Sequence, residues 1–360
     1  TKGNSGVMDM TQGNMAMLIL SFALPLMLGN VFQQFYTVAD TAIVGKILGV
    51  DALAALGTVE SINWLVLGTI QGITQGFGIL VSQQFGAKKE EALQETIFHA
   101  SFLAVVAAIL FTVGILIGLP GLVGILQVPV DIRPICLDYL YVLFGGIPLM
   151  MLYNFTAAML RAFGDSKTPL TACVIAALFN IALDLYFILE LGWGVKGAAL
   201  ATVLSQAIST IWVVVFLSGK KTQLHLRKKY MGLKPKVFLP CVALGLATFI
   251  MQASESVVTV CFNSSLLHYG GDIAVGAMTI LTSVMQFAML PLQGIAQGSQ
   301  PIASYNYGAK NADRVKKTFR LLVITCLTYS TLLWAAVQII PKVFVSIFTS
   351  DAKLVAFTAP

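Results

Sequence analysis

The sequence predicts an all-α integral membrane protein built from two related halves. Of its 360 residues, 57% are hydrophobic and only 11% are charged, whereas about a quarter of the residues in a soluble domain are charged. Charge-free stretches recur along the chain, and several exceed the ~20 residues that a helix needs to cross a bilayer. One segment also recurs 222 positions later, which indicates an internal duplication.

Nine membrane spans are expected, each on an apolar stretch with little charge. Helices are expected because the stretches are too long for the alternating strands of a barrel, and because lipid offers the backbone no other hydrogen-bond partner. The expected spans are 15–38, 54–82, 96–118, 135–159, 168–189, 197–217, 238–267, 274–303 and 318–340. A tenth would begin near Asp351, so we expect the second half to be incomplete in this chain.

The basic residues predict the orientation of the spans. If the spans alternate from an inside amino terminus, seventeen of the 22 Lys and Arg residues fall on the amino-terminal side. The positive-inside rule makes this side cytoplasmic, which predicts a multi-pass protein of the cytoplasmic (plasma) membrane. The formal charge of +6 is explained by this asymmetry and by contact with lipid, so nucleic acid binding is not expected.

The internal repeat predicts how the spans are grouped. The segment QGITQGFGILVSQQFGAKKEEA from Gln71 returns as QGIAQGSQPIASYNYGAKNADR from Gln293. Both copies end a span on the same side, and six spans separate them, so the repeat is parallel, with its axis along the membrane normal. We expect an amino-terminal six-helix bundle at 1–217, a basic cytoplasmic linker at 218–236 and a carboxy-terminal bundle at 237–360. The repeated glycines and amides indicate either an interior crevice or tight helix packing.

Three acidic residues lie within apolar surroundings: Asp40, Asp184 and Glu255. Inserting a charged residue at the centre of a spanning helix costs roughly 2.5–3.5 kcal/mol, so an ionisable residue at such a position indicates a functional site. Asn180 and Asp184 lie four residues apart on one helical face, as do Tyr36 and Asp40. Oxygen ligands of this kind suit Na⁺ or a proton. If Asp40 and Asp184 meet, burial and mutual repulsion would favour the protonated form of one of them. The alternative is a structural polar clamp between helices.

Other chemistry is not indicated. The sequence contains no GxSxG, Walker A or HExxH motif, and its cysteines and histidines are scattered without ligand spacing. We therefore expect no enzyme activity, no resident metal and no cofactor beyond a coupling ion. Because no motif for ATP binding is present, transport by this protein is expected to be driven by an ion gradient.

Three stretches carry a resemblance to a known family: VADTAIVG at the end of the first span, LRAFGDSKTP after the fourth, and FNIALDLYFI in the fifth. Together with the two halves and the basic central loop, they make the chain resemble the multidrug and toxic compound extrusion (MATE) family. The resemblance implies two pseudo-symmetric six-helix bundles around a central cleft. It also implies export of cationic, amphipathic molecules in exchange for H⁺ or Na⁺, by a monomer.

The resemblance also implies roles for single residues. Asp40 matches an aspartate whose protonation is linked to bending of the first helix, with Pro25 as a kink point. The ion-coupling set that it implies is Asp40, Asn180, Asp184, Thr202 and, in the second half, Glu255. Tyr36, Tyr139 and Asn154 match polar positions lining the cavity near that site.

Two other functions stay open at this point. A lipid-linked oligosaccharide flippase of the same superfamily would share the two bundles, but its cleft would carry more basic residues. A membrane scaffold or channel would use the buried acids as structural clamps.

Overall fold

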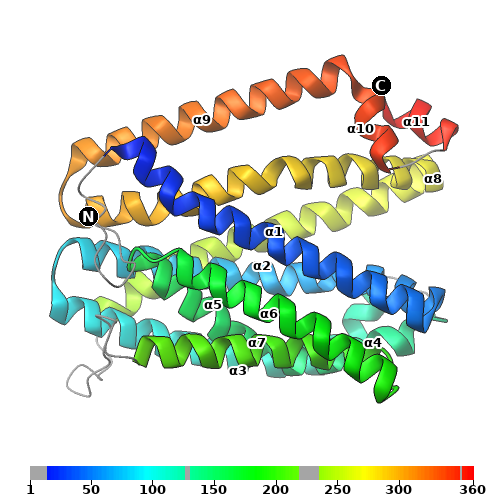
Figure 1. The fold of residues 1–360 in the computed structure, drawn as a ribbon, viewed down its shortest axis with the longest axis horizontal. Coiled ribbons are helices and arrows are strands. Elements are labelled where there is room, and N and C mark those ends of the chain that lie inside the picture. The colour runs from blue at the N-terminus through cyan, green and yellow to red at the C-terminus, as the bar shows by residue number, and fades with distance from the viewer. Residues whose placement is uncertain (1–13, 126–129, 219–234, 349–350) are drawn as a thin grey trace.

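The computed structural model describes residues 14–125, 130–218, 235–348 and 351–360, and the secondary structure of this part is entirely helical (Figure 1). The all-α class predicted from the sequence is therefore confirmed. At some positions inside the helices, among them Tyr36 and Glu60, only the backbone is described. The linker predicted at 218–236 lies outside the described residues except at its two ends.

The first half holds the spans that the sequence predicts, and the second half repeats their order. The first half contains α1 (Met15–Leu48), α2 (Val50–Gly86), α3 (Glu90–Ile125), α4 (Arg133–Gly145), α5 (Ile147–Ala162), α6 (Lys167–Leu185), the π-helical turn η1 (Tyr186–Glu190) and α7 (Val195–Ser218). The second half contains α8 (Pro235–Gly308), α9 (Ala312–Ile339), α10 (Pro341–Phe348) and α11 (Ala352–Thr358). Because α8 breaks at Gly271, it comprises two helices. A helix also begins just after Asp351, where the sequence predicts one.

Two expected spans differ in detail from the structure. Among the described residues, seven helices are long and apolar enough to cross a membrane, or eight if α4 and α5 form one span bent by 50°. The bend lies at Gly146 inside the expected span 135–159, because Pro148 in the first turn of α5 has no N–H to continue the helix. In the expected span 238–267, the apolar stretch is the shorter Val242–Glu255.

The duplication is visible in the backbone itself. Gly49, between α1 and α2, has a φ of 96°, and Gly271, at the break in α8, has a φ of 69°. Lys88 and Lys310, just after the two repeat helices, have φ values of 56° and 59° although they are not glycines. Both pairs are separated by 222 positions. Because positive φ is uncommon outside glycine, these matched turns indicate two copies of one structural unit.

In each half, the first helix packs against the second helix of the other half. In Figure 1, α1 runs between the α8–α9 layer and the layer of α5, α6 and α7. A Cβ at Gly294 of α8 would lie 2.2 Å from the Met27 Cγ of α1. At the matching position of α2, a Cβ on Gly72 would lie 3.3 Å from the Thr248 carbonyl oxygen in the first part of α8. The repeated glycines therefore serve tight helix packing.

The two repeat helices touch through their backbones where they end. A Cβ at Gly86 would lie 1.9 Å from the Tyr305 carbonyl oxygen, and a Cβ at Gly308 would lie 1.8 Å from the Gln83 carbonyl oxygen. Only glycine permits so close an approach. We call this end of the molecule, where α2 and α8 end, the closed end.

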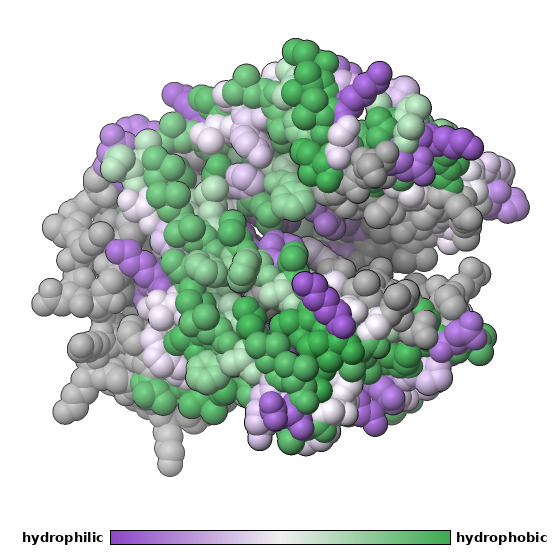
Figure 2. Space-filling view, turned by 45° about the vertical axis from the view of Figure 1, so that its right-hand side comes forward, coloured by the Kyte–Doolittle hydropathy of each residue, from purple (hydrophilic) through white to green (hydrophobic). Residues whose placement is uncertain are grey.

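The opposite end is hollowed. Figure 2 turns the side on which α1 ends and α2 begins toward the viewer, and shows a recess between the upper and lower parts with hydrophilic residues inside it. At the closed end, by contrast, the Ser82 hydroxyl donates a 3.1 Å hydrogen bond to the Pro301 carbonyl oxygen across the two halves. The molecule is thus open at one end and joined at the other.

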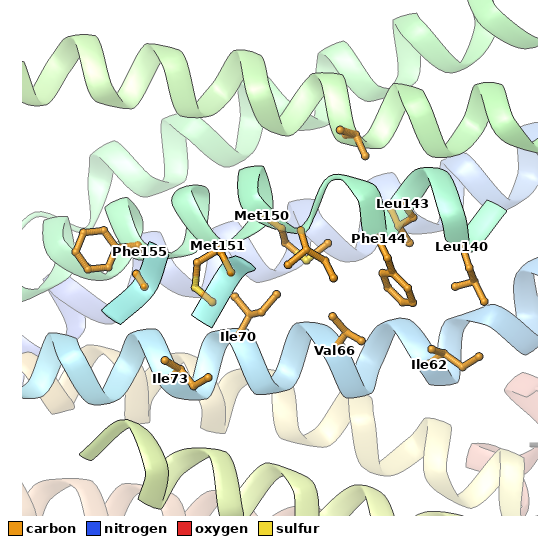
Figure 3. Packing of buried hydrophobic residues seen from close by; sticks show 14 of the residues in the cluster. Ile62, Val66, Ile70, Ile73, Leu140, Leu143, Phe144, Met150, Met151 and Phe155 are labelled. Atoms are coloured by element: carbon orange, nitrogen blue, oxygen red, sulfur yellow. The ribbon is translucent and has the colours of Figure 1, made fainter. Parts of the chain in front are cut away.

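A continuous apolar core holds the amino-terminal bundle together. Figure 3 shows side chains of α2 facing those of α4 and α5 across this core. Ile70, Phe144 and Ile147 in it are fully buried. The labelled residues of the figure are Ile62, Val66, Ile70, Ile73, Leu140, Leu143, Phe144, Met150, Met151 and Phe155. In lipid such packing supplies much of the attraction between helices, and it fixes the scaffold that carries the polar residues of α1, α6 and α7.

The closed end should not tolerate a side chain at its crossing glycines. We expect Gly86→Ala or Gly308→Ala to cost about 1–3 kcal/mol, because the added methyl meets backbone that cannot rotate away. Gly118→Ala in α3 is the matched control, since nothing lies within 4 Å of the added Cβ. Thermal unfolding in detergent measures the difference, and equal midpoints for all three variants would contradict the described crossing.

Candidate functional site

A cluster of four polar residues is assembled from three helices of the amino-terminal half. Asp40 comes from α1, Asn180 and Asp184 from one face of α6, and Thr202 from α7. Asp40 is 7% exposed, Asn180 2% and Asp184 0%. We call these four residues the acid cluster.

Hydrogen bonds between the helices hold the cluster in register. The Cys173 thiol of α6 donates to the Gly29 carbonyl oxygen of α1 at 3.3 Å. The Ser209 hydroxyl of α7 donates to the Ala172 carbonyl oxygen of α6 at 2.6 Å. Bonds of this kind contribute on the order of 0.6 kcal/mol each in membrane proteins. Their main consequence is that α1 and α7 are fixed against the two sides of α6.

Thr202 orients the amide of Asn180. The Thr202 hydroxyl donates to the Ala198 carbonyl oxygen at 3.2 Å and accepts a hydrogen bond from the Asn180 Nδ2 at 3.3 Å. Because its one hydrogen is used on the backbone, the hydroxyl presents only lone pairs to Asn180. The amide nitrogen is therefore turned toward α7.

The remaining polar atoms of the cluster are all oxygens. The carboxyl groups of Asp40 and Asp184 lie close enough to interact directly. Apart from this carboxyl–carboxyl pairing, no described residue donates a hydrogen bond to Asp40 Oδ1, Asn180 Oδ1 or either carboxyl oxygen of Asp184. Buried acceptors are almost always satisfied, so four such oxygens together require a hydrogen-bond donor or a cation. A shared proton, a small cation or water would supply it.

The backbone changes form next to Asp184. The α-helical hydrogen bonds of α6 end at Leu185, and the π-helical turn η1 follows directly. Insertions of this kind are frequent at functional sites. Beyond the turn, Phe187 stacks on Trp193 with ring centroids 5.0 Å apart, which fixes the end of the helix that carries Asp184.

The other residues predicted for the site lie elsewhere or are undescribed. Tyr139 is buried in the apolar core, and the side chain of Tyr36 is not described. The Asn154 amide donates to the Met150 carbonyl oxygen on its own helix at 2.8 Å. Their cavity-lining roles stay predictions.

Two further predicted residues lie apart from the cluster. Glu255 is exposed, in the first part of α8, and its role in ion coupling stays a prediction. Pro25 is buried inside α1, which is helical from Met15 to Leu48, so its role as a kink point also stays a prediction. Within the described residues, no group of three or more His, Cys, Asp or Glu could hold a metal ion.

The GDSKTP loop has a structural role at the start of α6. The Asp165 carboxylate accepts hydrogen bonds from the backbone N–H groups of Lys167, at 3.1 Å, and Thr168, at 3.0 Å, and from the Thr168 hydroxyl. It thereby caps the helix, while Gly164 takes the positive φ of 86° that the preceding turn needs. The loop sets the start of the helix that carries Asn180 and Asp184.

Comparison with known proteins gives the family. A family model described as MatE matches residues 25–186 and 247–360. The chain belongs to the MatE family. It is therefore a multi-pass membrane protein of a transporter family, as the resemblance of its motifs implied. Asp40, Asn180 and Asp184 of the acid cluster lie within the matched residues.

Named relatives of this MatE chain come from bacteria. It is 29% identical over 308 residues to the probable multidrug resistance protein YoeA of Bacillus subtilis, covering 83% of this chain and 66% of the relative. It is 25% identical over 347 residues to the probable multidrug resistance protein NorM of Thermotoga maritima, covering 94% and 73%. To the multidrug export protein MepA of Staphylococcus aureus it is 23% identical over 340 residues, covering 94% and 74%. The chain thus spans two thirds to three quarters of these relatives.

Solved structures share the fold. An outward-facing multidrug resistance MATE transporter of the MOP superfamily matches with a TM-score of 0.90 at 21% identity. A MATE transporter in a bent conformation matches at 0.90 and 22%. A MOP superfamily transporter from Pyrococcus furiosus, described as having a binding pocket of reverse polarity, matches at 0.89 and 21%. Each match covers all of this chain and 80% of the other. The predicted fold class, all-α and shared with transporters built from two six-helix bundles, is confirmed.

The cap at Asp165 should contribute to stability. We expect Asp165→Ala to cost about 1–2 kcal/mol, because it frees two backbone N–H groups and a hydroxyl at a helix start. Ser166→Ala is the control, since the neighbouring Ser166 makes no capping hydrogen bond with its side chain. Thermal unfolding of the purified variants measures both, and an equal loss in the two would contradict the assignment of the cap to Asp165.

Proposed function

We propose that this chain is a multidrug efflux antiporter that exports cationic, amphipathic compounds in exchange for H⁺ or Na⁺ by alternating access. The observation that carries the proposal is the acid cluster, in which two carboxyl groups face each other and no other described residue donates a hydrogen bond to four of the cluster's oxygens. The names of the relatives support drug efflux as the class of transport.

The cluster has the chemistry of a coupling site. Two buried carboxylates repel each other unless a positive species lies between them, and carboxylate, amide and hydroxyl oxygens are the ligands that a hard cation prefers. Asp40, Asn180, Asp184 and Thr202 would hold Na⁺, or the two aspartates would hold a proton. Either ion reduces the negative charge of the acid cluster, which a cationic cargo needs for binding. The ion and the cargo therefore compete for the protein with an unoccupied cluster.

Alternating access follows from the opposition of the two ends. The ion would enter from the hollow end and neutralise the cluster, which would release the cargo on that side. The protein then returns to a state open at the other end, where a new cargo binds. The fluxes of ion and cargo are coupled because the two compete for the cluster and cannot occupy it at the same time.

The basic residues support a placement in the membrane. With seventeen of the 22 Lys and Arg on the amino-terminal side, the closed end would face the cytoplasm and the hollow end the outside of the cytoplasmic membrane. The apolar outer surface would contact the lipid bilayer. We propose a monomer as the transporting unit, because both copies of the repeat lie in one chain.

The flippase alternative is disfavoured by the charge of the site. A cleft that binds a pyrophosphate needs basic side chains, whereas the buried ionisable residues of the acid cluster are aspartates. The Pyrococcus furiosus transporter with a pocket of reverse polarity belongs to the same fold, so pocket charge separates these functions and fold does not. The structural-clamp alternative predicts that donor groups of neighbouring helices bind the acids. Among the described residues, the group that Asp184 meets is the Asp40 carboxyl, which can donate a hydrogen bond only when one of the two acids is protonated.

Removing either carboxylate should abolish exchange without unfolding the protein. We expect Asp40→Asn and Asp184→Asn to reduce ethidium efflux from energised vesicles to background, because an amide cannot take up and release a proton or balance a cation. Glu91→Gln is the control, since Glu91 is an exposed acid on α3. Undiminished efflux in both aspartate variants, at equal protein levels, would end the proposal.

The coupling ion can be identified through Thr202. If Na⁺ is the coupling ion, Thr202→Val should raise the sodium concentration for half-maximal efflux roughly fivefold, equivalent to about 1 kcal/mol, because it removes an oxygen ligand and frees Asn180. Efflux at fixed pH, with and without a sodium gradient, is the measurement. Efflux that follows the pH gradient and ignores sodium in both proteins would assign the proton instead.

A further inference from the structure

A small polar cavity lies between the two halves, just inside the closed end. It has a volume of about 20 Å³, room for about one water molecule. Its polar lining consists of Gln75 from α2, Arg161 from α5, and Gln297, Gln300 and Ser304 from α8. Gln75 and Gln297 are equivalent positions of the repeat, so the cavity lies where the duplicated helices meet.

The cavity has one charged residue in its lining. Arg161 lies in the last turn of α5 and is partly buried, and no acidic side chain lines the cavity. Among the described residues, no salt bridge to Arg161 is found, and its guanidinium interacts electrostatically with Tyr153 of the same helix. Arginine stays protonated in proteins, so this cavity carries a fixed positive charge in surroundings where charges are weakly screened.

The cavity lies between the acid cluster and the closed end. On α2 and α8 its lining residues precede the crossing glycines Gly86 and Gly308 by one to three turns. Asp40, by contrast, lies near the opposite end of α1, about 12 Å of helix rise before Leu48. A cation that moves from the cluster toward the closed end along the boundary between the halves therefore reaches the cavity before the backbone contact.

We propose that Arg161 is an electrostatic seal, which keeps protons and other small cations from leaking across the closed end through this cavity. Backbone contact at the crossing glycines excludes large solutes, whereas a proton needs only a chain of hydrogen-bonded water, and the cavity has room for one member of such a chain. A fixed positive charge beside such a passage raises the free energy of a cation in it, as positive charge does in water-conducting pores. The proposal rests on the antiport function, since a leak would dissipate the gradient that drives export.

The test is passive proton flux without cargo. The purified protein is placed in vesicles of phosphatidylethanolamine and phosphatidylglycerol with a trapped pH-sensitive dye, and a pH step is imposed with potassium and valinomycin to prevent charge build-up. We expect Arg161→Gln to speed the collapse of the pH gradient roughly tenfold, equivalent to a barrier lower by about 1.4 kcal/mol. Arg161→Lys keeps the charge and should stay as tight as the unchanged protein.

A second variant tests the charge without removing the arginine. Gln297→Glu is nearly isosteric and adds a carboxylate to the cavity lining, which would neutralise Arg161, so we expect it to leak as Arg161→Gln does. Lys316→Gln is the control, because Lys316 is an exposed basic residue in the first turns of α9. If Arg161→Gln does not fold, Gln297→Glu decides alone.

The outcomes separate the seal from the antiport function. Leaks in Arg161→Gln and Gln297→Glu with a tight Arg161→Lys support the seal, whether or not cargo export is observed. Equal leaks in Arg161→Lys and Arg161→Gln would show that the shape of the side chain matters rather than its charge, and would overturn the proposal. Tight vesicles for both Arg161→Gln and Gln297→Glu, in a protein that exports cargo, would overturn it and leave the antiport function standing.

Discussion

The contact between α2 and α8 at Gly86 and Gly308 is the constraint on which the other features depend. Two helix backbones meet there without side chains between them. Joining the halves at this end leaves them apart at the other, where the hollow lies. It also places Gln75, Gln297 and Arg161 around one small cavity. The crossing of two glycines thus sets which end is open and what lies between the halves.

The acid cluster is buried at a cost that its protein neighbours do not offset. Membrane insertion of one carboxylate costs a few kcal/mol, and here two of them face each other with Asn180 turned toward Thr202. Helix α6 is held on one side by the Cys173–Gly29 hydrogen bond and on the other by Ser209–Ala172. The scaffold therefore keeps the two acids together in spite of their repulsion. A site that alternately binds and releases a coupling ion needs such an arrangement, because the acids must stay in place when the ion has left.

Local patterns in the sequence predict much of this, and contacts between distant segments set the rest. The helical class follows from apolar runs, and the pairing of Asn180 with Asp184 follows from their spacing of four residues on one helix. The convergence of Asp40 with Asp184 does not follow from the sequence, since no spacing of residues fixes how α1 meets α6. The bend at Gly146 has a signal in the sequence, the GGIP stretch, but an apolar run does not by itself show where a helix bends. Arg161 had none, because its cavity exists only where α5 meets both repeat helices.

The crossing at the closed end also has a particular symmetry. Gln83 of the first copy lies against Gly308 of the second copy. In the reverse direction, Gly86 of the first copy lies against Tyr305 of the second copy. In the repeat, Gly308 is the equivalent of Gly86, and Tyr305 is the equivalent of Gln83. A contact in which residue i meets j and j meets i is the isologous contact of a two-fold dimer. The boundary between the halves therefore retains the form of a homodimer interface whose two subunits have been fused. A single half, produced alone, carries both partners of this contact and has the geometry to pair with itself.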